Sequence, residues 1–521
     1  MAKPVYIAGV GLTKVDLTGR VFGSIFDLFA EAYENALQNS RVVSFGAVQV
    51  GVMDSEEFEN RANIAAKVAD RLGLRGVPAV RSETASSTGA AAFHEACHKI
   101  AAGQCDSVLV LAGERMKTVT TEMATRIMSK TVDPVERHFG FTMPGLIALL
   151  TRAWLQERGI HGPRAQALLA RLMVRAHALG AENPLAAFYG RPEPLEAYFD
   201  PERNRPVATP LLRKDCSPIC DGAAAVILSA RPQAVRVVGL GSATESSSLL
   251  DRVSLSRLDA TRQAARVAYW QAGIPEPRQL EGLVVEAHDA FNSLLPIDLV
   301  DLGLAEPDEA VSCLVGALDA PPLNPLSHPS SGVAGRLPTN LSGGLKARGH
   351  PVGGTGLFQI AECYLQLTER FPNPAAQVPR AQLGIAHSIG GPGNNVYVTL
   401  IERSDARRER AHVEPPRRAF QTRPSHPPTP RPAELDGARA VVEAATTIFV
   451  TGRAGAAPVR VALVSLDGLR AFAKLDPEPG EEEGAEEHLA GRRVRLRVGE
   501  DGDLHGSPER GPRWLQMLRG G

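Results

Sequence analysis

Two stretches of this sequence resemble each other at both ends, and this internal echo limits the folds open to the chain. Val5-Tyr6-Ile7-Ala8-Gly9-Val10-Gly11 opens the first stretch, and Val235-Arg236-Val237-Val238-Gly239-Leu240-Gly241 opens the second. The apolar runs Gly222–Leu228 and Asn395–Ile401 close them. A duplication of this kind predicts two similar halves packed against each other.

The region up to residue 403 alternates short β-branched strands with long helical patterns, which is typical of an α/β layered architecture. Asp106–Gly113 and Glu281–Ala287 have the continuous apolar pattern of buried strands. We therefore place the two halves at residues 1–233 and 234–403.

A composition change follows the second half. Residues 404–434 are rich in proline and arginine, as in Pro427-Pro428-Thr429-Pro430, and read as a semi-extended linker with solvated arginines. Short alternating strands resume at 446–450, 459–464 and 493–498, with Asp467-Gly468 as a tight turn. Residues 435–521 thus predict a small β-barrel, and the acidic run from Glu481 to Glu487 predicts a solvated loop.

Charge and cysteine usage exclude several classes of function. The net charge of −1 over 521 residues gives no bulk electrostatic reason to bind nucleic acid or an anionic membrane. No run of about 18 apolar residues predicts a membrane span, and the start lacks the apolar core of a signal peptide. The 6 cysteines are scattered, which indicates free thiols in a reducing, cytoplasmic compartment.

Three glycine-rich or polar segments are candidate sites. Arg348–Gly356 surrounds His350 with glycines, which allow close approach of backbone to a ligand. His288 follows a buried strand, at the sheet edge where α/β proteins bind ligands. Ala386–Gly393 precedes the last strand of the second half, as either a simple turn or a loop whose N–H groups point into a cavity.

Two other patterns have plainer explanations. His94-Glu95-Ala96-Cys97-His98 matches the H-E-x-x-H zinc pattern, but it follows the small-residue run Gly89–Ala92, which suits burial between helices. We expect no metal there. Gly9-Val10-Gly11 and its later echo lack the third glycine of a dinucleotide loop.

Together the three candidate segments resemble those of the thiolase superfamily, in the sterol-carrier and archaeal style. Lys214–Ala224 is similar to the segment that closes the family's first half, and Thr339–Gly344 to the approach to its histidine. The resemblance covers about residues 3–403. It implies a duplicated fold of two βαβαβαββ halves, layered α-β-α-β-α, that is at least a dimer. It also implies acyl-CoA as substrate, with no cofactor beyond that thioester, and a place in lipid metabolism.

The C-terminal region resembles the small OB-fold proteins that partner such thiolases. Those partners usually carry a zinc ribbon, but no cysteine follows Cys363 here, so the ribbon is absent. The resemblance implies that this OB-fold domain docks on the thiolase body or covers the acyl-CoA entrance.

The resemblance also assigns roles to individual residues. Ser86, in Glu83-Thr84-Ala85-Ser86-Ser87-Thr88-Gly89, stands where the family has its nucleophilic cysteine, and Ser388 stands where it has a second cysteine. His350 and His288 are the expected acid–base groups. The expected oxyanion and substrate-binding residues are Gly390, Asn340, Gly349 and Gly353.

Three functions remain open from the sequence. The first is acyl transfer with Ser86 as an unusual nucleophile, although a serine hydroxyl needs a strong adjacent base. The second is retro-aldol cleavage of a 3-hydroxyacyl-CoA, which needs a base and enolate stabilisation but no cysteine. The third is acyl-CoA binding without catalysis.

Overall fold

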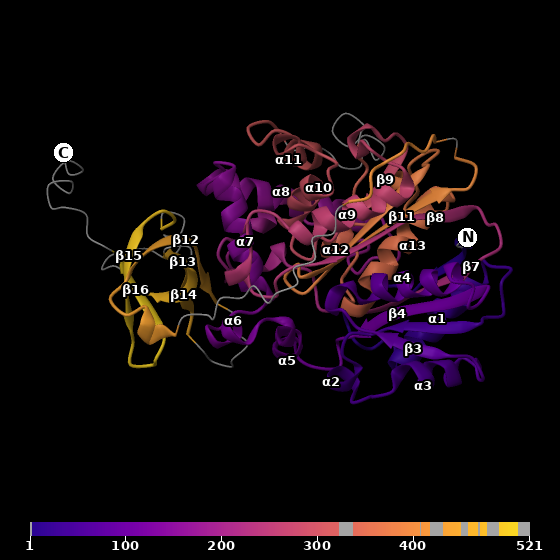
Figure 1. Ribbon diagram of the computed structural model, residues 1–521, viewed down its shortest axis with the longest axis horizontal. Coiled ribbons are helices and arrows are strands. Elements are labelled where there is room, and N and C mark those ends of the chain that lie inside the picture. The colour runs from indigo at the N-terminus through magenta and orange to yellow at the C-terminus, as the bar shows by residue number, and fades with distance from the viewer. Residues whose placement is uncertain are drawn as a thin grey trace.

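The computed structural model describes residues 3–321, 337–406, 408–416, 431–449, 457–466, 469–476 and 489–508. An α/β body and a smaller β-barrel at one end make up the molecule (Figure 1). Residues 407 and 417–430 of the expected linker, the Asp467-Gly468 turn and the acidic run 481–487 lie outside the described residues.

The first half of the body holds five strands of the main sheet, four helices near them, and a long insertion. The strands are β1 (Tyr6–Leu12), β2 (Ala47–Gly51), β3 (Ala79–Ser82), β4 (Ser107–Arg115) and β7 (Asp221–Ser229). The helices are α1 (Ile25–Leu37), α2 (Ser55–Glu59), α3 (Ile64–Arg71) and α4 (Thr88–Ala101). The insertion holds α5 (Thr121–Met128), α6 (Pro134–His138), α7 (Met143–Glu157), α8 (Gly162–Ala181), β5 (Pro206–Ala208) and β6 (Leu211–Leu212).

The second half repeats this plan in shorter form. Its strands are β8 (Val235–Thr244), β9 (Leu283–Glu286), β10 (Leu383–Gly390) and β11 (Asn395–Arg403). Its helices are α9 (Asp259–Ala272), α10 (Leu294–Asp301), α11 (Pro307–Val315), α12 (Gly344–Ala347) and α13 (Thr355–Leu367).

The sheet order confirms the duplication. The order is β3-β2-β4-β7-β1-β8-β11-β10-β9, and the halves meet where Tyr6 pairs with Arg236 and Ile7 with Val235. On each side of that junction the pattern of partners is the same. β7 lies antiparallel between β1 and β4, and β11 lies antiparallel between β8 and β10, while β4 pairs with β2 and β10 with β9 in parallel.

Helices α4 and α13 are the equivalent helices of the two halves, and they pack directly against each other at the centre. A Cβ added at Gly89 would lie 2.8 Å from the Leu357 nitrogen, and one at Gly356 would lie 2.6 Å from the Ala90 nitrogen. The small residues expected to suit burial therefore let the two backbones touch. The outer faces of the sheet are covered by α1 and α3 in one half and α9 in the other (Figure 1).

The C-terminal strands form the expected closed barrel. They are β12 (Arg439–Ile448), β13 (Val459–Leu466), β14 (Leu469–Leu475), β15 (Arg493–Val498) and β16 (Leu504–Pro508). Their order is β13-β14-β16-β15-β12, and pairing of β12 with β13 closes the ring. β14 and β16 are parallel, whereas the other barrel pairs are antiparallel.

The barrel is attached to the body by main-chain pairing as well as by side chains. Ile448 of β12 pairs with Ala208 of β5, and the Phe449 N–H donates to the Val207 carbonyl at 3.0 Å. The Phe472 ring lies with its centroid 5.0 Å from that of Phe141 in the insertion.

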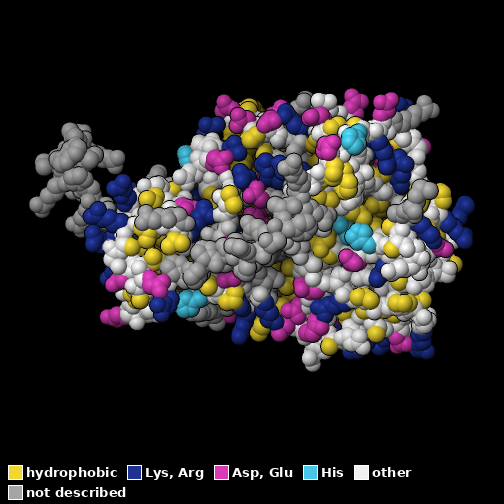
Figure 2. All heavy atoms as spheres, in the orientation of Figure 1, with side chains coloured by type: hydrophobic (Ala, Val, Ile, Leu, Met, Phe, Trp, Pro, Cys, Tyr) yellow, Lys and Arg dark blue, Asp and Glu magenta, His cyan; other side chains and the backbone are white. Residues whose placement is uncertain are grey.

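Acidic and basic side chains are intermixed over the face of the molecule in Figure 2. No helix among the described residues is long and apolar enough to cross a membrane.

Candidate active site

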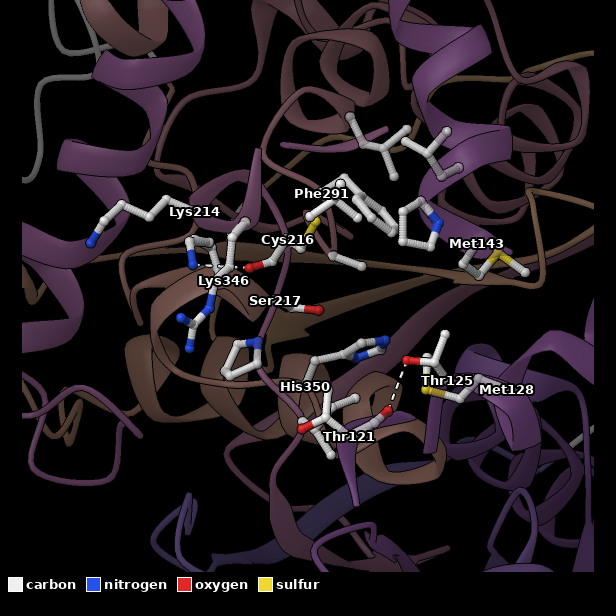
Figure 3. A pocket seen from close by; sticks show the side chains of 18 of the residues that line it. Thr121, Thr125, Met128, Met143, Lys214, Cys216, Ser217, Phe291, Lys346 and His350 are labelled. Atoms are coloured by element: carbon white, nitrogen blue, oxygen red, sulfur yellow. Dashed lines mark hydrogen bonds between the residues drawn. The ribbon is translucent and has the colours of Figure 1, made fainter. Parts of the chain in front are cut away.

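A cavity of about 1000 Å³ opens where the two halves and the insertion meet (Figure 3). That volume is at the upper end of the range for small-molecule sites. Three of the predicted catalytic residues, Ser86, His288 and His350, line it together although they are far apart in the sequence. The fold thus brings these three residues together on one cavity wall.

Ser86 reaches the cavity from a strained turn. It lies in the short 3₁₀ helix Ala85–Ser87 that leads into α4, and Ala85 before it has φ of +54°. A left-handed alanine is uncommon, and such strain clusters at functional turns. The first N–H groups of a helix have no partner within it, so Ser86 stands in a locally positive field.

Gly390 brings the end of β10 against this turn. A Cβ there would lie 2.3 Å from the Thr84 carbonyl oxygen and 2.6 Å from Ser87 Oγ. Only glycine lets the strand end approach the Ser86 turn this closely.

His350 is held in one tautomer. Its Nδ1 lies 2.6 Å from Thr355 Oγ1, and that hydroxyl donates to the Pro351 carbonyl at 3.1 Å. Since the hydroxyl proton is used there, Thr355 accepts the Nδ1 proton and Nε2 is left as the basic nitrogen. Burial, assisted by the charge of Arg348, lowers the pKa of His350 to about 3, so the ring is neutral at pH 7.

His288 is held in the opposite tautomer. The Ile389 N–H donates to its Nδ1 at 3.3 Å, which places the ring proton on Nε2. Burial, then the charges of His350, His387 and Arg348, hold its pKa well below the usual value. The two rings are perpendicular, with centroids 5.2 Å apart. One wall of the cavity thus offers a neutral N–H donor beside a neutral imidazole base.

Asn340 supports His288 from behind and is not among the cavity-lining residues. Its side chain accepts from the Ala287 N–H at 2.7 Å and donates to the Ala287 carbonyl at 3.0 Å. This pair of bonds fixes the backbone next to His288. Asn340 therefore acts on the position of the histidine, a role that spacing in the sequence does not reveal.

The remaining predicted residues also lie behind the cavity wall. The Ser388 hydroxyl is buried and has no hydrogen-bond partner among the described residues, and it faces Gly356 of α13. Because side chains alternate along a strand, its neighbour Ile389 is the one that lines the cavity. Gly349 has φ of +115°, and Gly353 donates its N–H to the buried Glu114 at 3.2 Å. Both glycines shape the loop that holds His350.

The zinc-like pattern on α4 serves the core. His94 Nε2 lies 2.8 Å from Thr399 Oγ1, and burial lowers the pKa of His94 to about 3. His98 is exposed and lies next to Glu95 on the helix surface. No cluster of metal-binding side chains occurs among the residues that the structure describes.

The sequence interpretation missed most of the cavity wall, which the insertion supplies. Met128, Met143 and Phe291 give the wall an apolar side (Figure 3), whereas its arginines are exposed and therefore stand at the mouth. The basic residues on the wall are Lys117, Arg203, Arg205, Arg213, Lys214 and Lys346. Their one sequence signal is that Lys214 begins a segment singled out for its motif, while Lys346 lies between two such segments.

Cys216 is the cysteine on this wall, and it is not activated. Its Sγ lies 3.6 Å from the Leu212 carbonyl oxygen, and burial, assisted by Asp215, raises its pKa to about 12. The thiolate is the nucleophilic form of cysteine, so this thiol is a poor nucleophile at neutral pH.

Comparisons with known proteins agree with this architecture. The model of the thiolase N-terminal domain matches residues 5–184, and the thiolase C-terminal domain-like model matches residues 241–403. The acetyl-CoA acetyltransferase of Methanothermobacter thermautotrophicus is 33% identical over 414 residues, covering 77% of this chain and 100% of that protein. Sterol carrier protein 2 of Rattus norvegicus is 28% identical over 414 residues, covering 76% of this chain and 71% of that protein.

Two solved structures share the fold at 19% identity. The monomeric SCP2-thiolase like protein type 1 of Mycobacterium smegmatis has a TM-score of 0.69 and covers 96% of this chain and 98% of its own. A chain of the Ltp2-ChsH2(DUF35) aldolase has a TM-score of 0.61 and covers 78% of this chain and 99% of its own. With both domain models matched in order and an archaeal relative aligned over its full length, the chain belongs to the thiolase family.

Proposed function

We propose that this protein is a thiolase-like enzyme that breaks the carbon–carbon bond next to an acyl-CoA thioester by retro-aldol cleavage of a 3-hydroxyacyl-CoA. The observation that carries the proposal is the pair of neutral histidines held in opposite tautomers on one cavity wall. A retro-aldol reaction needs a base for the hydroxyl and a donor for the enolate, and no acyl-enzyme.

The proposed reaction uses each histidine once. His350 Nε2 takes the proton of the 3-hydroxyl group, the C2–C3 bond breaks, and C3 becomes a ketone or aldehyde. The electron pair moves to C2 and the thioester oxygen, where the His288 Nε2–H stabilises the enolate. The proton held by His350 then returns to C2, which yields a shortened acyl-CoA and restores both rings.

The described residues that line the cavity include no activated thiol, which supports this choice over thiolysis. Ser86 stands where the resemblance implies a cysteine, and Cys216 has a raised pKa. The exposed arginines at the mouth fit the phosphates of coenzyme A, and the apolar side fits an acyl group. One solved structure with the same fold is named as an aldolase, which is in keeping with this chemistry on the fold.

The test is product analysis with 3-hydroxyacyl-CoA esters of several chain lengths. We expect a free ketone or aldehyde and a shortened acyl-CoA in equal amounts, detected by mass spectrometry. Removing one acid–base group typically costs about 10²–10⁴-fold in rate, so His350→Ala and His288→Ala should each lose about that much. His98→Ala, on the exposed end of α4, is the control. Unchanged cleavage in both cavity variants would rule out the assignment.

A second candidate is acyl transfer through Ser86, favoured by its place on the cavity wall at the start of α4. Among the described residues no hydrogen bond joins Ser86 to His350, so the base would have to move or act through water. Incubation with acyl-CoA followed by intact mass measurement tests it, with Ser86→Ala as the blank. An adduct that maps to Ser86 would support acyl transfer, and its absence during turnover would remove it.

The third candidate is an acyl-CoA-binding subunit without catalysis, and a single experimental result would support it. Binding of coenzyme A esters with turnover of neither 3-hydroxyacyl-CoA nor 3-ketoacyl-CoA would favour it. The barrel would then serve assembly. We propose instead that the barrel acts on the acyl-CoA entrance, because β5, which pairs with β12, carries the cavity residues Pro206 and Val207.

A further inference from the structure

Lys346 is a buried cation on the wall of the catalytic cavity. It lies on α12, four positions before His350, and it is 4% exposed. Its Nζ donates to the Cys216 carbonyl at 2.9 Å, the bond drawn next to the Lys346 label in Figure 3. The ammonium also lies 5.6 Å from the centroid of the Phe188 ring.

No carboxylate pairs with this ammonium among the described residues. Asp215 and Glu193 act on Lys346 electrostatically, but the oxygens of Asp215 accept from Tyr198, Leu212 and Asn292. Glu193 is paired with Lys214 at 2.8 Å. The other titratable neighbours are Cys216 and His177, which burial holds in their neutral forms.

A buried charge without a counter-ion is costly in free energy, so an anion that binds next to Lys346 would lower this cost. An ammonium has three donors, and one carbonyl uses one of them. Burial lowers the pKa of Lys346 to about 8, so its side chain carries a proton in most molecules at pH 7. The missing partner is therefore an anion that enters the cavity.

The position of Lys346 separates it from the basic residues at the mouth. Arg203, Arg205 and Arg213 are exposed, as expected for groups that meet the phosphates of coenzyme A. Lys346 is buried on the wall that carries His350, where the reacting acyl part must lie. We propose that Lys346 binds a carboxylate on the acyl group, so that the substrates are acyl-CoA esters with a free carboxylate at the acyl end. This rests on the proposed function only in that the cavity binds acyl-CoA.

The test compares matched ligands by calorimetry on the full-length protein. Succinyl-, glutaryl- and adipoyl-CoA are paired with butyryl-, valeryl- and hexanoyl-CoA, which are of similar length without the carboxylate. In the wild type we expect at least one carboxylated ligand to bind tenfold or more tightly than its neutral partner. Lys346→Met should reduce that ratio to about one and leave the Kd of coenzyme A itself within twofold. Lys67→Met, at an exposed lysine of α3 that does not line the cavity, is the control and should preserve the ratio.

Two further measurements keep the proposal falsifiable if Lys346→Met does not fold. Lys346→Arg retains the charge and should retain a ratio above one. In the wild type the ratio should fall as pH rises from 7 to 9.5, because the ammonium loses its proton while the carboxylate stays charged. A constant ratio over that range, or a wild-type ratio of one for all three pairs, would overturn the proposal.

Other outcomes separate the possible anions and the two proposals. If Lys346→Met weakens coenzyme A and all esters equally, the anion is a phosphate of coenzyme A and the acyl carboxylate is refuted. If coenzyme A esters do not bind at all, the proposed function fails as well. If carboxylated esters are preferred but no 3-hydroxyacyl-CoA is cleaved, the subsite stands and only the reaction is wrong.

Discussion

Replacing Thr355 by valine tests the central claim that the tautomers of the two histidines differ. Thr355 is completely buried, and its hydroxyl makes both the 2.6 Å contact with His350 Nδ1 and the 3.1 Å bond to the Pro351 carbonyl. Valine has nearly the same shape but cannot accept or donate a hydrogen bond. A buried polar group left unsatisfied costs about 1–3 kcal/mol, and here the Nδ1–H is such a group.

This cost bears directly on the rate. Without the Thr355 acceptor, the His350 ring favours the tautomer with its proton on Nε2, in which Nε2 is not a base. Returning to the active Nδ1–H tautomer then costs the same roughly 1–3 kcal/mol. We therefore expect Thr355→Val to lower kcat by about 5- to 150-fold, with KM within about twofold. The free energy of unfolding should also fall by roughly 1–3 kcal/mol. Thr355→Ser keeps the hydroxyl and should recover most of both quantities.

Two readouts check this reasoning. Nitrogen chemical shifts of ¹⁵N-histidine-labelled protein, assigned with His350→Asn and His288→Asn, should report Nδ1–H for His350 and Nε2–H for His288. Retro-aldol product formation gives kcat and KM. The same tautomer for both rings in the wild type would refute the geometric argument. A Thr355→Val variant that folds and turns over at the wild-type rate would refute the catalytic one.

Three further outcomes follow from the packing and the pKa values. Gly390→Ala would place a Cβ 2.3 Å from the Thr84 oxygen, so we expect a lower melting temperature and weaker acyl-CoA binding by calorimetry; unchanged values would mean that the turn has room. Phe472→Ala removes the ring packed on Phe141 and should cost about 3–5 kcal/mol in a denaturant titration that follows the barrel and body together. The pKa of His350 is lowered to about 3, so the unfolded chain binds its proton first as pH falls. The stability of the wild type relative to His350→Asn should therefore be greatest above about pH 6.5 and fall towards pH 3, and a constant difference across this window would contradict the argument.

Periodicity and motif order predicted the body because its folding signals are local. The paired starts and ends of the two halves lie in β1, β8, β7 and β11, and all four are central strands that must be apolar. The residues around His350 and His288 were found for a related reason, since glycines that permit close approach and polar residues at strand ends can be read without contacts. His288 and His350 do line one cavity, as expected.

The same reasoning could not tell lining residues from supporting ones. Ser388 and Ile389 are adjacent in sequence, yet the strand turns Ile389 to the cavity and Ser388 to α13. Asn340 reads like a ligand-binding residue but fixes the backbone of Ala287. Which way a side chain faces depends on the register of its strand in the sheet, and register is a property of the pairing.

By itself, the sequence determined the duplicated α/β body, the separate C-terminal strands and the serine at the start of α4, because these depend on residue type and local pattern. Only the tertiary structure decided which histidine nitrogen carries a proton, since that depends on Thr355 and the Ile389 N–H. It alone placed Lys346 in the cavity with no acidic partner among the residues that the structure describes, and it alone joined β5 to the barrel. Hydrogen-bond partners and the lack of them are set by distance in space, which no local pattern records.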